Sequence, residues 1–198
     1  MKTRKLSVLI GAAVLCLTLP RVVLAHAGDP TGGFLNGFTH PMFGPDHVLA
    51  MVAVGLWGAQ LGAPAIWLLP VAFPMVMACG GFLGLIGVPL PGIEFGIALS
   101  ALILGGLVFR QVRPPLPVAL TIVGVFAIFH GHAHGTELPA GDSGVLYSIG
   151  FVIGTGLLHA AGILLGLIDR WTWGAKVIQW AGLLIAAGGL FFLYRAVA

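Results

Sequence analysis

The chain has 198 residues, of which 59% are apolar and only 8% are charged. Soluble proteins carry about 25% charged residues, so this composition excludes a soluble domain and predicts repeated membrane spans of roughly 20 residues each. The net charge of +3 comes from nine basic residues that form no basic run, so we expect no nucleic-acid partner. No glycine-rich phosphate-binding loop occurs, so we expect no ATP hydrolysis either.

Residues 1–25 are typical of a secretory signal peptide. Lys2, Arg4 and Lys5 form a basic start, an apolar core follows, and Val-Leu-Ala at 23–25 offers a cleavage site. An uncleaved signal anchor is the alternative. We expect cleavage, which makes His26 the new N-terminal residue and leaves 26–198 as a single transmembrane domain.

The rest of the chain divides into six apolar segments at its proline, glycine and charged interruptions. The segments cover residues 33–61, 65–87, 92–109, 116–134, 144–168 and 176–195. Their connections are short, so we expect sequential helices to be antiparallel neighbours in a compact bundle. The sequence therefore predicts an all-α polytopic membrane protein with six transmembrane helices after signal removal.

The basic residues orient this bundle. Two loops on the same side of a six-span alternation carry Arg110, Arg113, Arg170 and Lys176, whereas the opposite side carries acidic residues after the fourth span. By the positive-inside rule the basic side is cytoplasmic. We therefore expect a multi-pass protein of the bacterial inner membrane whose mature N-terminus is periplasmic.

Five of the seven histidines fall in two short clusters, and the first cluster, residues 40–47, reads His-Pro-Met-Phe-Gly-Pro-Asp-His. Pro41 and Pro45 predict an interruption of the first helix between them, with Pro45 starting a new helix. Interrupted helices at membrane depth line cavities, and transporters place ion sites there. We therefore expect His40, Asp46 and His47 to bind a metal ion. Alternatively, the aspartate only caps the helix and the first histidine contacts lipid headgroups.

The second cluster, residues 130–137, reads His-Gly-His-Ala-His-Gly-Thr-Glu. In a helix His130 and His134 share one face and His132 points elsewhere, whereas in an extended chain all three face the same way. Both geometries remain open, as does a merely solvated helix end. We expect these three histidines and Glu137 to bind metal. The predicted topology gathers both clusters and His26 in the outer half of the membrane.

Two further residues are candidates of different strength. His159 stands alone in the fifth span, where it is either a hydrogen-bonded structural residue or a second station on an ion path. Glu94 begins the third span, and compensation of the helix dipole explains it better than metal binding. Imidazoles with carboxylates and no thiolate suit nickel, cobalt, zinc or copper, with Met42 and Met51 nearby as soft donors. We expect no permanently bound cofactor.

These motifs resemble the HupE/UreJ family of bacterial membrane proteins, which is linked to hydrogenase and urease maturation and to nickel or cobalt permeation. The resemblance rests on residues 40–47 followed by Val-Gly-Leu-Trp at 54–57, on residues 129–137, and on Leu-His at 158–159 with Gly162. It covers essentially the whole mature chain. It implies metal uptake across the inner membrane by His40, Asp46, His47, His130, His132 and His134, joined by Glu137 and His159.

We therefore predict a secondary transporter, a permease for Ni2+ (or Co2+), that supplies nickel enzymes such as hydrogenase or urease and is not itself an enzyme. The ion would arrive at His26 and the second cluster, pass to the first, and leave past His159. One alternative is a non-transporting metal-binding accessory protein. Another is an intramembrane metalloenzyme, which the absence of a His-Glu-x-x-His motif disfavours. The glycine motifs would serve a homo-oligomer as well as packing within one chain, so the oligomeric state stays open.

Overall fold

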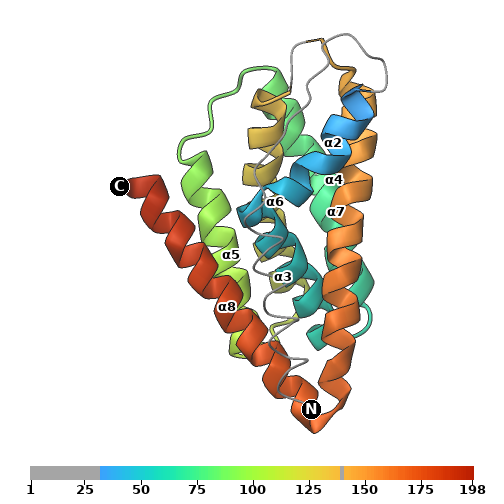
Figure 1. The fold of residues 1–198 in the computed structure, drawn as a ribbon, viewed down its shortest axis with the longest axis vertical. Coiled ribbons are helices and arrows are strands. Elements are labelled where there is room, and N and C mark those ends of the chain that lie inside the picture. The colour runs from blue at the N-terminus through green and yellow to red at the C-terminus, as the bar shows by residue number, and fades with distance from the viewer. Residues whose placement is uncertain (1–31, 139–140) are drawn as a thin grey trace, which may run out of the picture.

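The computed structural model describes residues 32–138 and 141–198, and the expected signal peptide with His26 lies outside these residues. The described residues are helical and include no strand (Figure 1), which confirms the all-α prediction. The elements are α2 (Gly32–Phe43), α3 (Pro45–Leu61), α4 (Ala65–Leu85), α5 (Ile93–Phe109), α6 (Leu116–Thr136), α7 (Gly144–Gly166), the 3-10 turn η1 (Leu167–Arg170) and α8 (Thr172–Val197).

Four of the described helices are long and apolar enough to cross a membrane on their own. They cover Ala65–Leu85, Leu116–Thr136, Gly144–Arg170 and Trp173–Val197. Helices α2 and α3 meet at an angle of 79° and make a fifth span if they are counted as one broken crossing. Helix α5 is apolar but has only 17 residues, about 25 Å of helix against a hydrocarbon core of about 30 Å. The chain is thus a multi-pass membrane protein, and its sixth crossing remains a prediction.

The predicted interruption of the first helix lies at a single residue. Pro41 is contained within α2, so the stretch after it is helical and our expectation of an irregular segment between the two prolines was too wide. Gly44 alone is extended, with φ −88° and ψ 103°, and Pro45 opens α3 as predicted. Proline suits that first helical position because its missing N–H has no partner there in any helix.

The closest helix neighbours are mostly not sequential, contrary to our expectation. Helix α4 packs along α6, α5 along α8, and α2 with α3 along α7. These pairs meet where glycines bring two backbones together. Gly80 lies against Ile128 and Gly84 against Gly135, so α4 and α6 run in the same direction. Close packing through small residues is the usual way in which membrane helices associate, and here it outweighs neighbourhood in the sequence.

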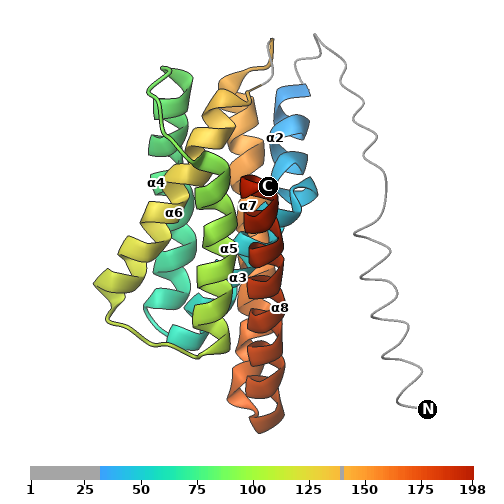
Figure 2. The same ribbon diagram turned by 90° about the vertical axis from the view of Figure 1, so that its left-hand side faces the viewer.

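Helices α5 and α8 run in opposite directions, side by side in both views of the ribbon (Figure 2). Gly105 lies against Ala186, and Gly189, further along α8, lies against Leu102, earlier on α5. These directions are the ones expected if each successive span crosses the bundle in the opposite direction to the one before it. They agree with the alternation predicted from the loops, although the neighbours differ.

Helix α3 runs through the middle of the bundle. It contacts α4, α5, α7 and α8, and side chains along most of its length are buried, among them Met51, Leu56 and Trp57. Trp57 donates its indole N–H to the Val112 carbonyl at 2.9 Å, which ties the C-terminal half of α3 to the loop after α5. The first turn of α3, which carries Asp46 and His47, therefore leads into a helix that is buried in the middle of the bundle.

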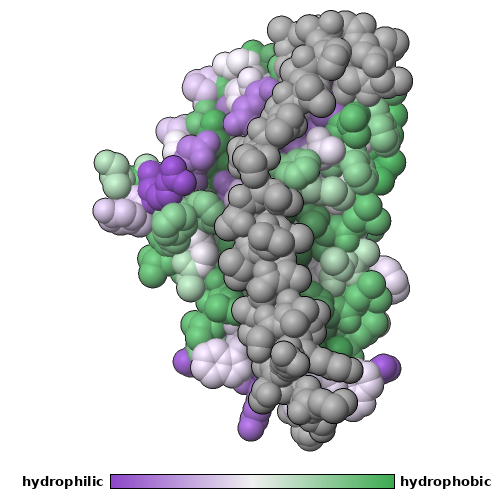
Figure 3. All heavy atoms as spheres, in the orientation of Figure 1, coloured by the Kyte–Doolittle hydropathy of each residue, from purple (hydrophilic) through white to green (hydrophobic). Residues whose placement is uncertain are grey.

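On the visible face, hydrophilic side chains lie towards both ends of the bundle and near the C-terminus, and apolar side chains cover much of the surface between them (Figure 3). At one end the loops after α5 and α7 meet, with Arg113 3.5 Å from the Asp169 carboxylate. Towards the other end lie Glu137 and Asp142, and Asn36 donates to the Asp142 carboxylate at 2.8 Å. The two loops that carry the basic residues thus lie at the same end of the bundle, as the sequence analysis expected.

Candidate metal site

The first histidine cluster surrounds the break between α2 and α3. His40 comes from the last turn of α2, whereas Asp46 and His47 come from the first turn of α3. A Cβ atom at position 44 would lie 2.9 Å from Nδ1 of His47 and 3.2 Å from a carboxylate oxygen of Asp46. Glycine is therefore required at the break for these two side chains to keep their positions.

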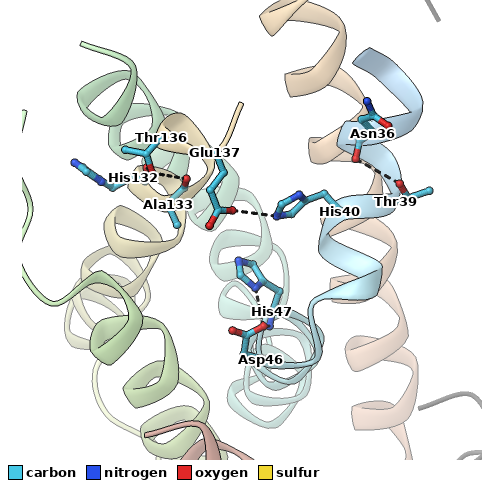
Figure 4. Close-up of polar contacts among 9 residues, drawn as sticks. All are labelled: Asn36, Thr39, His40, Asp46, His47, His132, Ala133, Thr136 and Glu137. Atoms are coloured by element: carbon cyan, nitrogen blue, oxygen red, sulfur yellow. Dashed lines mark hydrogen bonds and ion pairs between the residues drawn. The ribbon is translucent and has the colours of Figure 1, made fainter. Parts of the chain in front are cut away.

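Asp46 holds His47 in a fixed orientation. One carboxylate oxygen accepts from the backbone N–H of His47 at 2.9 Å and lies 2.9 Å from its ring Nδ1 (Figure 4). A carboxylate at this nitrogen favours the tautomer that carries its proton on Nδ1 and leaves a lone pair on Nε2. That Nε2 atom is buried and has no hydrogen-bond partner among the described residues. Asp46 thus orients His47 so that the lone pair on its buried Nε2 atom is free to bind a metal ion.

The second cluster is helical through Thr136, which decides between the two geometries left open by the sequence. His130 and His134 share a face of α6, one turn apart. The ring Nδ1 of His130 lies 3.0 Å from the Phe126 carbonyl, so its Nε2 atom is the one left unpartnered, and both ring nitrogens of His134 are unpartnered within the described chain.

The glycines between these histidines face α4. A Cβ atom at Gly131 would collide with the carbonyl of Met77, and one at Gly135 with the carbonyl of Gly81. The alternation of histidine and glycine therefore has a simple cause: one face of α6 packs against a neighbouring backbone while another carries the imidazoles.

Four imidazoles from α2, α3 and α6 lie in contact. The ring of His134 is 4.7 Å from the ring of His40 and 4.7 Å from that of His47, measured between centroids. The rings of His47 and His130 are 5.0 Å apart. Histidines that are 83 to 94 residues apart in the sequence thus share one cluster inside an otherwise apolar bundle.

Glu137 joins the cluster at its outer edge. Its carboxylate lies 3.6 Å from Nε2 of His40, and ligand atoms of His40, His134 and Glu137 all lie within 4.8 Å of one another. Ligand atoms on one ion at about 2.1 Å are at most about 4.2 Å apart, so a small movement would let these three bind together. We call His40, His134 and Glu137 the outer set, and His47, His130 and His134 the inner set.

Exposure falls steeply from the outer set to the inner set. The side chains of Glu137 and His40 are 51% and 33% exposed, whereas His47, His130 and His134 are buried. Burial also raises the pKa of the Glu137 carboxyl, and the nearby charge of Glu94 acts in the same direction. The cluster is therefore open at one end of the bundle and closed toward its middle.

Two cavities adjoin the cluster, and they differ in character. One of about 390 Å3 is lined by Glu94 and Glu137 from the facing ends of α5 and α6. The other, of about 620 Å3 between α4, α6 and α7, reaches His134 but is lined mostly by apolar side chains such as Phe82 and Phe151. A hydrated cation suits the carboxylate-lined cavity. Glu94, which the sequence analysis assigned to the helix dipole, lies on its wall.

His132 is not brought together with the other histidines. Its ring points away from His40 and His47 (Figure 4), and its Nε2 atom lies 2.6 Å from the carbonyl of Val88. This contact ties α6 to the loop between α4 and α5. The position fits a structural role, whereas our sequence analysis had counted His132 among the metal-binding residues.

His159 lies deeper in the bundle, on α7. It is buried, and neither ring nitrogen has a hydrogen bond of good geometry with a described residue, although the backbone of Pro70 on α4 is close enough to act as a polar partner. The ring of Phe73 contacts both His130, at 5.4 Å between centroids, and His159, at 5.5 Å. His159 is thus separated from the inner set by an aromatic side chain that offers no ligand atom.

The fold and the site define a multi-pass helical membrane protein that holds a cluster of imidazoles and carboxylates at one end of its bundle. Residues 14–192 match the family model described as HupE / UreJ protein. The chain is 44% identical to Protein HupE of Rhizobium leguminosarum bv. viciae over 193 residues, which cover 98% of this chain and 99% of that relative. The chain belongs to the HupE/UreJ family. No solved structure matches it.

Family membership confirms the resemblance on which several expectations rested. The family is one of membrane transporters and accessory proteins associated with hydrogenase, urease and nickel or cobalt, rather than one of catalysts. The expectation of a non-enzymatic membrane protein agrees with this. Which ion the chain handles, and whether it moves that ion, belong to the proposal below.

Proposed function

We propose that this protein is a permease for divalent transition-metal ions, Ni2+ or alternatively Co2+, in the bacterial inner membrane. In this proposal the chain crosses the membrane six times with its mature N-terminus in the periplasm, and it supplies metal to enzymes such as hydrogenase or urease. One observation carries the proposal: four imidazoles from three helices converge in the apolar bundle. Ionisable groups are costly at such depth and are retained where an ion passes.

The two ligand sets suggest how an ion would move inward. Glu137 and Glu94 line the polar cavity, so their negative charge attracts a cation to the outer set. His134 belongs to both sets and lies at equal ring distances from His40 and His47. An ion bound by the outer set could therefore exchange His40 and Glu137 for His47 and His130 while His134 stays attached. Ligand exchange around one shared residue avoids a fully unliganded ion in the membrane.

The chemistry of the ligands favours borderline metals. Neutral imidazole nitrogens with one or two carboxylates suit nickel, cobalt, zinc and copper, whereas calcium and magnesium need cages of oxygen atoms. The ligands alone do not separate nickel from cobalt. The association of the family with nickel and cobalt favours these two ions over zinc and copper.

The test is metal flux into liposomes that contain the purified protein and an entrapped metal-sensitive dye. We expect Ni2+ to enter protein-containing liposomes faster than empty ones, and an excess of Co2+ to compete better than an excess of Zn2+ or Cu2+. His47→Ala and His130→Ala should reduce the flux to that of empty liposomes. If the wild-type protein binds Ni2+ but does not move it, the protein is a metal-binding accessory protein and the permease proposal is wrong.

A further inference from the structure

The hydroxyl of Thr155 differs from the other serine and threonine hydroxyls described within helices. The side chains of Thr39, Ser100, Thr121, Thr136 and Ser148 each donate to a backbone carbonyl three or four residues earlier. Such a bond is the usual way to satisfy a hydroxyl in a membrane helix. Thr155 is completely buried, yet its Oγ1 atom has no hydrogen-bond partner among the described residues.

An unpartnered buried hydroxyl costs free energy, about 1 to 3 kcal/mol by protein mutational data. Valine has nearly the same shape and would avoid that cost. The presence of threonine at position 155 is therefore not explained by packing, and a ligand for its oxygen is the alternative.

Thr155 stands on the face of α7 that lines the imidazole cluster. Phe151, one turn before it, contacts His134 at 4.1 Å between ring centroids. His159, one turn after it, is the deeper buried histidine. Successive turns place these three residues about 6 Å apart along the helix axis, so the hydroxyl lies halfway between the level of His134 and that of His159.

The register between α3 and α7 gives the same level from the other side. Gly55 packs against the carbonyl of His159 and against Gly162, and the two helices run in the same direction. Seven residues earlier on each helix, Val48 and Thr155 therefore stand at one level, just below His47 and one turn above His159. One turn further along α3, near the level of His159, Met51 is also completely buried, and its thioether sulfur is a weak ligand.

We propose that Thr155 is an intermediate station on the metal path, at which its hydroxyl oxygen binds the ion between the inner set and His159. This inference rests on the permease function proposed above. Without such a station the ion would travel about 7.5 Å along α7, from the level of His47 to His159, beside an apolar Phe73 ring. A hydroxyl binds Ni2+ weakly, which suits a station that must release the ion again.

The experiment compares Thr155→Val with Thr155→Ser, both in the full chain reconstituted into liposomes with an entrapped dye and Ni2+ as the transported probe. We expect Thr155→Val to lower the maximal flux about tenfold, the effect of a barrier raised by about 1.4 kcal/mol. Thr155→Ser keeps the oxygen and should retain most of the flux. Equilibrium Ni2+ binding to the purified protein should be the same in all three, because the outer and inner sets are intact.

A matched control is Thr121→Val, which makes the same chemical change on an exposed face where the hydroxyl donates to the Pro117 carbonyl. It should leave the flux unchanged. The melting temperature of Thr155→Val should be no lower than that of the wild type, since valine removes the unpartnered oxygen. A folded Thr155→Val protein that transports Ni2+ at the wild-type rate would overturn the proposal that Thr155 is a station on the metal path.

An equal loss in Thr155→Val and Thr155→Ser also overturns it, because the side-chain shape and not the oxygen then matters. The failure of the proposed function looks different. In that case the wild-type protein itself moves no Ni2+, and the station is rejected together with the permease.

Discussion

Asp46 and His47 are neighbours in the sequence and are joined twice in space, with both the backbone N–H and the ring Nδ1 of the histidine 2.9 Å from one carboxylate oxygen. A carboxylate in this position orients a histidine that binds metal through its other nitrogen. The pair therefore converts a flexible side chain at the start of α3 into a fixed donor. From this geometry we propose that Asp46 acts through His47, whereas the sequence analysis expected it to bind the ion itself.

Replacing Asp46 by asparagine tests this arrangement. Asp46→Asn removes the charge that favours the required tautomer of His47 but keeps the size of the side chain. We expect the affinity for Ni2+ to fall by about 10- to 100-fold, the usual cost of losing a residue that orients a metal-binding histidine. Equilibrium dialysis of the purified protein with Ni2+ measures it.

Asp169→Asn is a suitable control for that substitution. Asp169 pairs with Arg113 at the opposite end of the bundle, and its replacement should leave Ni2+ affinity unchanged. An Asp46→Asn protein with wild-type affinity would show that the carboxylate serves only as a helix cap.

Gly44→Ala tests whether the break between α2 and α3 positions the ligands. The new Cβ atom would lie 2.9 Å from Nδ1 of His47, closer than side chains tolerate, so the histidine must turn away from Asp46. We expect the transport rate to be lost while the protein remains folded. Liposome flux and circular dichroism check the two parts of this prediction.

Gly106→Ala provides the comparison for the same chemical change. A Cβ atom there has open space in α5, and alanine within a helix is more stable than glycine by about 0.5 to 1 kcal/mol. Gly106→Ala should therefore raise stability and leave the flux unchanged. Equal transport by Gly44→Ala and Gly106→Ala would mean that the break has no role in the site.

The fold could be predicted from the sequence as far as the type and limits of its elements. Hydropathy and proline positions located the six apolar segments in which the described helices lie, because each depends on local composition, although α8 begins four residues earlier than predicted. The packing partners could not be predicted in this way. Whether α4 lies against α5 or α6 depends on which glycine faces match, such as Gly80 and Gly84 with Gly135, and a single sequence does not show which faces meet.

The site was predictable to a similar extent. The motifs identified its histidines, and helical spacing already separated His132 from His130 and His134 as one of two options. The sharing of His134 between two ligand sets was not predictable, because it depends on the 79° bend that brings His40 back over α3. The cavity that Glu94 and Glu137 line together was not predictable for the same reason, because it follows from how α5 and α6 lie together.

His134 and His132 should respond to substitution in opposite ways. His134→Ala removes the one side chain common to both ligand sets, so we expect the flux to fall to the background of empty liposomes. His132→Ala loses only the contact with the Val88 carbonyl, which should lower stability by about 1 kcal/mol and leave Ni2+ binding intact. Flux and thermal unfolding of the two variants give the comparison. If His132→Ala also abolishes binding, the assignment of His132 to a structural role is wrong.

Acidification of the outer solution should slow uptake. An imidazole must be neutral to bind a metal ion, so protonation of histidines in the cluster removes ligands as the pH falls. Burial raises the pKa of Glu137, so its carboxylate is protonated at a higher pH than an ordinary glutamate and adds to the loss. Both protonations remove ligands, so their effects have the same sign. Initial Ni2+ flux measured between about pH 5 and pH 8 should therefore decline toward the acidic end. Glu137→Gln should transport more slowly throughout but keep the decline caused by the histidines, and a wild-type rate that increases on acidification would contradict this account of the outer set.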